Sequence, residues 1–213
     1  KVGNSMSTLA VNQITTQTGD TITLPTGKKI VGTDAASIVA PGHVIQTVTG
    51  TYDTLTSTTS KTPTTAISVN ITPSSTSSKI LVMMQTWAWH NNYYTGYLGI
   101  FRGSTDITLG TGNATDGNWS SGGYQGSGIG VRTAESYNLQ SGNSGTAANW
   151  APFSFSHTIL DSPSSTSQQT YALKFWTNDG GVGTSNPLYI NRANNISNSP
   201  RPISTLTLQE IAG

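Results

Sequence analysis

Aromatic side chains gather in two parts of the chain, beside amide and hydroxyl groups. One part reads WAWHNNYYTGY from Trp87 to Tyr97, and the other is the region 110–150. A sugar ring stacks its C–H face on an aromatic ring while amides and hydroxyls bind its hydroxyl groups, so this mixture suits a carbohydrate site. The candidate ligand-binding residues are Trp119, Tyr124, Tyr93, Tyr94, Asn91 and Asn92.

Packing is the alternative role for these aromatic residues. Trp87 and Trp89 share strand parity with Leu81 and Met83, which favours a place in the core or at a subunit interface. A tryptophan in a loop, such as Trp119, also often packs beneath its own loop. Both interpretations therefore stay open for the loop aromatics.

A hydrolytic site would have to combine His157, Asp161 or His90 with one of the 27 serines. No Gly-x-Ser-x-Gly motif precedes a predicted helix, and nothing in the spacing of the acids selects a pair that could act as glycosidase acid and base. Because so many serines make chance combinations common, we predict that the protein is not an enzyme. The acids considered for such a pair are Asp106, Asp116, Glu135 and Asp179.

Metal and nucleotide motifs are present only as fragments. Asp116-Gly117-Asn118 and Asp179-Gly180-Gly181 lack the alternating ligands and the closing glutamate of a calcium loop, so turn formation explains them. The glycine run at 126–130 is not followed by Gly-Lys-Ser/Thr, and the chain has no cysteine to bind zinc as a thiolate. We predict no metal site and no cofactor.

The composition of the chain argues against two classes of binding partner. The 213 residues include 35 Thr and 27 Ser, charged residues make up only 9%, and the formal net charge is +1. Nucleic acids and anionic membranes require clustered Lys and Arg, so neither is expected as a partner. The longest apolar run, Ile80–Met84, is too short to cross a bilayer, which argues against membrane insertion.

Residues 1–39 form an arm in which apolar residues recur between tight turns such as Pro25-Thr26-Gly27. An arm of this length cannot bury a core alone. We expect it to bury its apolar face against copies of itself, and the alternative is an arm that folds back on the main domain of the same chain.

Longer strands are predicted from Ala40 to the end of the chain. The pattern predicts no amphipathic helix of useful length. Alternating apolar residues predict an all-β domain at 40–213, an antiparallel β-sandwich of jelly-roll type. The expected strands are 44–52, 65–72, 79–89, 97–102, 106–109, 152–160, 170–177, 188–191 and 203–211, with a short one at 128–133.

Residues 110–150 form the one long stretch without strand periodicity. It is rich in Gly and Asn and still contains aromatic residues, which a simple flexible linker would lack. Loops of this length are usually functional or mobile. We predict that this region and residues 91–95 form the exposed end of the domain and carry any ligand contact.

Several blocks of the sequence look like the fibre or tail-fibre structural proteins of marine bacteriophages. They read STLAVNQITTQTGDTITLPTGKKIVGTDAASI, PGHVIQTVTGTYDT, ISVNITPSSTSSKILVMM, LGIFRGST, ILDSP and ISTLTLQEIAG. The likeness covers nearly the whole chain except Gly110–Trp150, and its motifs are turns and strands.

The resemblance implies a virion protein and a homotrimer. In it, residues 1–39 would be a slender interwound β stem that attaches to other virion proteins, and residues 40–213 would be a head available for contact with the host. The aromatic and amide residues described above add the expectation that the head contacts a host surface polysaccharide. The alternatives are a capsid fibre or decoration protein without a dedicated ligand, and a free carbohydrate-binding module.

Overall fold

The computed structural model describes residues 25–31, 40–90, 95–108, 129–132, 153–178, 187–192 and 201–213. The chain divides into two units, residues 1–38 and residues 39–213. In the first unit, the predicted turn at Pro25-Thr26-Gly27 is present: the Lys28 amide donates a 3.0 Å hydrogen bond to the Pro25 carbonyl, and Gly27 has a φ of +80°. The rest of the predicted stem lies outside the described residues.

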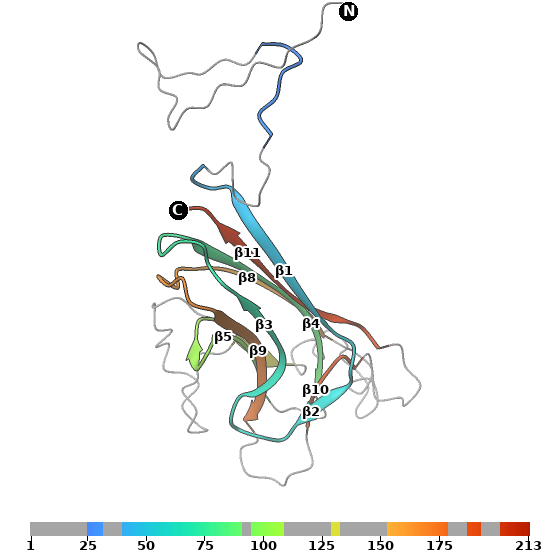
Figure 1. Ribbon diagram of the computed structural model, residues 1–213. Coiled ribbons are helices and arrows are strands. Elements are labelled where there is room, and N and C mark those ends of the chain that lie inside the picture. Colours follow the sequence, from blue (N-terminus) through green and yellow to red (C-terminus); the bar gives the residue numbers. More distant parts are fainter. Residues whose placement is uncertain are drawn as a thin grey trace, which may run out of the picture. The chain divides into compact units, whose positions relative to one another are not determined.

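The second unit is built from antiparallel β-strands, and its described residues contain no helix (Figure 1). The strands are β1 Val44–Tyr52, β2 Thr56–Thr58, β3 Thr64–Ile71, β4 Lys79–His90, β5 Thr95–Arg102, β6 Thr105–Asp106, β7 Ile129–Arg132, β8 Phe153–Asp161, β9 Gln169–Asn178, β10 Leu188–Ile190 and β11 Ser204–Ile211.

Two sheets face each other. In the first, called sheet A, β4 pairs on one edge with β8 and on the other edge with β11 and then β10; β1 adds to β11, and β2 adds to β10. In the second, sheet B, the order is β3-β9-β5, and β5 is flanked by β6 and β7. The long strands pass between the sheets in the sequence typical of a jelly roll, which confirms the predicted fold class.

Two details of the predicted strand pattern were wrong. Thr56–Thr58 forms β2, although its polar sequence was expected to be loop; it has no hydrophobic alternation and is held as a strand by pairing with β10. The strand expected at 106–109 is only the two-residue β6, which turns back on β5 after the Gly103-Ser104 turn.

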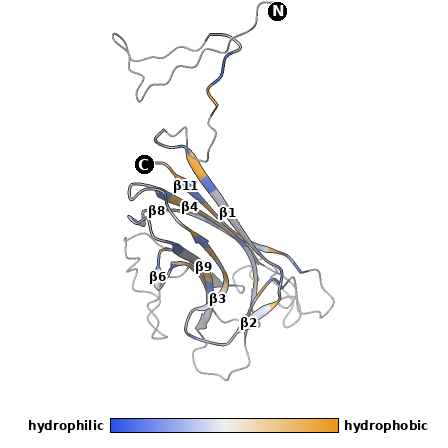
Figure 2. Cartoon of the chain, viewed as in Figure 1, coloured by the Kyte–Doolittle hydropathy of each residue, from blue (hydrophilic) through white to orange (hydrophobic). Residues whose placement is uncertain are grey.

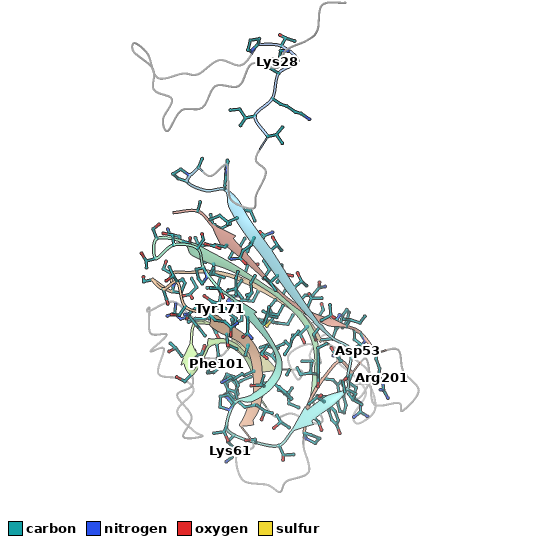
Figure 3. The ribbon with its side chains drawn as sticks, viewed as in Figure 1. Lys28, Asp53, Lys61, Phe101, Tyr171 and Arg201 are labelled. Atoms are coloured by element: carbon teal, nitrogen blue, oxygen red, sulfur yellow. The ribbon has the colours of Figure 1, made fainter. Side chains whose placement is uncertain are left out.

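Alternate residues of the strands fill the space between the sheets (Figure 3). Ile67, Val69, Ile71 and Leu173 are buried, as predicted. Phe175 belongs to the same core, whereas Trp176 is buried on the opposite, outer face of sheet B, because the two residues are neighbours on β9. Other large core side chains are Ile80, Val82, Met84, Leu98, Ile100, Tyr171, Leu188, Ile190, Leu206 and Leu208.

Two glycines let the sheets approach closely. A Cβ on Gly50 of β1 would lie 2.5 Å from Cγ2 of Val69 on β3, and one on Gly96 of β5 would lie 2.7 Å from Cδ1 of Leu188 on β10. Any larger residue would push a core side chain aside. The close packing of the sandwich therefore depends on these two positions.

The chain enters sheet A through a turn at Ala40-Pro41-Gly42, where the longer strands were predicted to begin. The His43 amide donates to the Ala40 carbonyl at 3.0 Å, and Gly42 has a φ of +86°. The first residues of β1 are hydrophobic and appear orange in Figure 2. Among the described residues, no helix has the length and apolar character needed to span a bilayer.

Candidate functional site

The strand register gives the sandwich two distinct ends. At the entry end, β1 begins at Val44, and Val44 pairs with Ile211 near the C-terminus. At the other end, here called the distal end, β1 stops at Tyr52, which pairs with Ser204. Each end carries its own set of polar side chains, and these sets differ in chemistry.

Glu210 lies on β11 at the entry end, and its side chain points into the space between the sheets. Its side chain is fully buried, and one carboxylate oxygen accepts hydrogen bonds from the Ser74 amide (2.7 Å), the Ser74 hydroxyl (2.6 Å) and the Ser78 hydroxyl (2.7 Å). The other oxygen accepts one from the Gln46 amide at 2.6 Å. Burial alone would raise the pKa of Glu210, but these hydrogen bonds from Gln46, Ser74 and Ser78 outweigh it and hold the pKa below its ordinary value.

Asp161 ties the two sheets together at the same end. Its carboxylate accepts a 2.8 Å hydrogen bond from the Arg102 guanidinium, with which it forms an ion pair, and a 2.7 Å hydrogen bond from the Tyr171 hydroxyl. Burial, followed by the hydrogen bond to Asp161, raises the pKa of Tyr171 above its ordinary value. Asp161 and Glu210 both pair with Ile80, one on each side.

The residues considered for a hydrolytic site have other partners where the structure describes them. His157 donates from Nε2 to the Thr108 carbonyl at 3.1 Å and lies four positions from Asp161 along β8, a separation of about 13 Å. Asp106 accepts hydrogen bonds from the amide and hydroxyl of Thr108, as in a turn. The side chains of His90, Asp116, Glu135 and Asp179 lie outside the described residues.

No group of three or more His, Cys, Asp or Glu that could hold a metal ion occurs within the described part of the chain. The acids at the entry end illustrate the reason. Glu210 and Asp161 use their oxygens to accept hydrogen bonds from neighbouring side chains, and each is held in a separate cluster.

A buried chain of hydrogen bonds holds the distal end. The Thr86 hydroxyl lies 2.7 Å from that of Ser204, which donates to the Asn191 side-chain oxygen at 2.6 Å. The Asn191 amide in turn donates to the carbonyls of Tyr52 (2.7 Å) and Thr54 (3.2 Å). Asn191 has a φ of +61°, a left-handed conformation that Asn tolerates better than most residues. The network joins β1, β4, β10 and β11.

An aromatic cluster lies next to this network on the outer face of sheet A. Trp89 of β4 and Tyr189 of β10 are cross-strand partners whose ring centroids are 5.3 Å apart. The Arg192 guanidinium carbon lies 4.7 Å from the Trp89 centroid and 4.2 Å from that of Tyr189, within the range of a cation–π contact. Trp89 is only 1% exposed, although it does not face the inter-sheet core.

The six predicted ligand-binding residues all fall outside the described residues. Asn91, Asn92, Tyr93 and Tyr94 follow the end of β4 and precede the start of β5, so the strands that flank them end at the distal end. The flanks of residues 133–152 also end there, because Arg132 pairs with Thr95 and Phe153 pairs with Ala88. Trp119 and Tyr124 differ, since the strands on either side of them are β6 and β7, at the edge of sheet B.

The polar clusters around Glu210, Asp161 and Asn191 were not predicted from the sequence. For Glu210, however, the strand pattern contained a usable signal. Glu210 shares strand parity with Leu206 and Leu208, so it had to point into the sandwich. An acid at such a position needs hydrogen-bond donors around it. Asn191 had no comparable signal, because its side-chain partners come from β1, the residues just after β1, and β11, all far from it in the sequence.

No protein-family model matches the sequence, and no curated protein matches it either.

We expect Glu210 to make stability depend on pH. Because its folded pKa is depressed, the stabilisation is present above the unfolded pKa, which is near 4.5, and is lost as pH falls through the folded pKa. At pH 7, Glu210→Gln should cost about 1–3 kcal/mol, since the amide cannot accept all the hydrogen bonds. Urea unfolding at pH 7 and pH 3 should show a smaller pH effect for the variant; an equal effect would contradict the assignment.

Asn191 should be among the most sensitive polar positions in the sandwich. Asn191→Ala removes the buried hydrogen bonds and leaves a β-carbon in a left-handed conformation, so we expect a loss of about 2–4 kcal/mol. Asn191→Gly removes the same bonds but relieves the backbone conformation, and it should be less damaging by about 1 kcal/mol. Thermal unfolding of both variants measures the difference, and the reverse order would show that backbone conformation is unimportant here.

Proposed function

We propose that the chain is a structural subunit of a bacteriophage virion fibre. In this proposal the protein is a homotrimer whose N-terminal arm joins other virion proteins and whose β-sandwich head contributes to attachment to a host surface polysaccharide. The fold supports the proposal in its general form, because a jelly-roll sandwich presents loops at its two ends on a rigid scaffold.

The observation that carries the proposal is the polarity of the sandwich. The segment Ala40–His43 leads into β1 and Ala212 follows β11, and the two are hydrogen bonded to each other: the Gly42 amide donates to the Ala212 carbonyl at 2.8 Å, and the Ala212 amide donates to the His43 carbonyl at 2.8 Å. The strands flanking Asn91–Tyr94 and residues 133–152 end at the opposite end. Attachment to the virion and contact with a host would thus use different ends.

The sequence between β4 and β5 and the sequence before β8 favour a neutral ligand. The stretch Asn91-Asn92-Tyr93-Tyr94 offers amides and aromatic rings with no charged group, and Trp150 closes the segment that leads into β8. Such groups recognise sugar hydroxyls and the apolar face of a sugar ring. A trimer would present three such sets of residues, so weak individual contacts would add up through avidity.

The trimer is tested by multi-angle light scattering of the purified chain. We expect a mass of three subunits at micromolar concentration. A monomer would contradict the fibre proposal and would favour the free carbohydrate-binding module, because a fibre subunit needs to assemble.

The position of the contact is tested with two double variants. Tyr93→Ala with Tyr94→Ala should reduce binding to cells or to a glycan array at least about tenfold, because the loss is repeated in every subunit of a multivalent particle. Trp119→Ala with Tyr124→Ala is the matched comparison, since its flanking strands lie at the edge of sheet B. If neither variant changes binding while both remain folded trimers, the head has no aromatic ligand site, and the decoration protein is favoured.

A further inference from the structure

The outer face of sheet A is a broad, regular surface built from the long strands of the sheet. It is formed by four neighbouring strands, in the order β8, β4, β11 and β1 (Figure 1). Rows of side chains cross it from strand to strand: Leu160, Leu81, Gln209 and Thr47 form one row, and Thr158, Met83, Thr207 and Thr49 form the next.

The central strand of this face is apolar where a solvent-facing strand is normally polar. Leu81, Met83 and Trp87 point outward, away from the core residues of β4, and all three are only half-buried. Leu160 on β8 and Val44 at the start of β1 are each 53% exposed. The face therefore leaves apolar surface uncovered along its length.

On the outer face of sheet B, by contrast, the outward aromatic residues Phe101 and Trp176 are buried. Trp176 and Phe101 are 2% and 7% exposed, and the Lys174 ammonium lies 4.4 Å from the centroid of the Phe101 ring. The Tyr97 ring stacks on Trp176 at a centroid distance of 5.6 Å. The outer apolar groups of sheet B are thus covered within the subunit, and those along β4 from Leu81 to Trp87 are not.

Charge is almost absent from the outer face of sheet A. Lys79, at the entry end of β4, is the one charged residue among the outward positions of its four strands. The other outward positions carry hydroxyls, amides and apolar groups. They are Ser154, Ser156, Thr158 and Leu160 on β8, Leu81, Met83, Gln85, Trp87 and Trp89 on β4, Thr205, Thr207, Gln209 and Ile211 on β11, and Val44, Thr47, Thr49 and Thr51 on β1.

The size of the face is adequate for a specific protein contact. β1 and β8 have nine residues each. With about 3.4 Å per residue and about 4.8 Å between strands, four such strands cover roughly 600 Å² of flat area, and side chains make the accessible area larger. A standard interface buries about 800 Å² on each partner.

We infer that the outer face of sheet A packs against further copies of this chain, so that the head as well as the arm takes part in assembly. The inference rests on the proposed homotrimer and names the surface that it uses. Hydroxyls and amides both donate and accept hydrogen bonds, so this face is chemically complementary to itself. In a trimer, groups near the threefold axis meet their own copies and groups further out meet a different part of the neighbouring subunit, and a face with so few charges can do both with little repulsion.

A charged partner would fit less well. It would find few groups with which to form an ion pair, since Lys79 lies at the entry end of the face and Arg192 lies over Trp89 and Tyr189 at the distal end. Apolar residues in the middle and hydroxyls around them also match the usual layout of a subunit contact, with an apolar centre and a polar rim.

The experiment compares two isosteric substitutions in the full chain. Gln85→Glu places a carboxylate in the middle of the outer face of sheet A, and Asn70→Asp places one on the outer face of sheet B, where Asn70 is likewise exposed. We expect Gln85→Glu to raise the concentration at which the trimer dissociates by at least about tenfold, because the contact would bury a carboxylate that has no partner of opposite charge. Asn70→Asp should leave it unchanged.

Methionine oxidation gives a second measurement, which still works if the arm alone keeps the chains together. Met84 points into the core and Met83 onto the outer face, so the two neighbours report the two sides of β4. In the wild-type trimer, hydrogen peroxide should oxidise Met83 nearly as slowly as Met84, as followed by mass spectrometry. In Gln85→Glu, Met83 should oxidise at least about fivefold faster.

The outcomes separate this inference from the proposed function. A wild-type trimer in which Met83 oxidises rapidly, and which Gln85→Glu leaves unaltered, would overturn the inference but leave the fibre proposal standing. A wild-type monomer would overturn both. Protection of Met83 in such a monomer would show that residues of the same chain cover the face.

Discussion

The structure depends above all on the pairing of β4 along both of its edges. This 12-residue strand pairs with β8 on one side and with β11 and β10 on the other, so it fixes the register of all three. Its inward residues Ile80, Val82 and Met84 form part of the core, and Ile80 sets Asp161 and Glu210 on either side of itself. The register of β4 therefore sets the positions of the Asp161 and Glu210 clusters at the entry end.

A sandwich without disulfides must also close its open ends, where the apolar layer meets water. In this protein, hydrogen-bonded polar side chains between the strands close the entry end. Glu210 gathers donors from the β3–β4 turn and from β1, and Asp161 joins β8 of sheet A to β5 and β9 of sheet B. Buried carboxylates of this kind cost free energy unless every oxygen is satisfied, so they fix one arrangement of the strands rather than simply adding stability.

The sequence predicted those parts of the fold that depend on periodicity. Strands such as Val44–Tyr52 were recognisable because apolar residues alternate, and the double-sided apolar pattern of β4 indicated a central strand. β2 could not be predicted, since its three residues become a strand only through pairing with β10. The same limit applies to the Asn191 network and to the contact of Arg192 with Trp89, which join residues far apart in the chain. The local alternation of apolar and polar residues gives no information about contacts between residues that are distant in the sequence.

The low charge of the chain gives the two proposals a common physical basis. With charged residues at 9% and a formal net charge of +1, neither self-association through the outer face of sheet A nor contact with a neutral polysaccharide would depend on ion pairs. Salt shortens the reach of charge interactions to about 3 Å at 1 M, but it does not weaken apolar burial. Contacts built from hydroxyls, amides and aromatic rings would therefore persist in a saline medium. A chain that relies on such contacts has to restrict its uncovered apolar groups to faces that are covered on assembly, and the half-buried row along β4 fits that requirement.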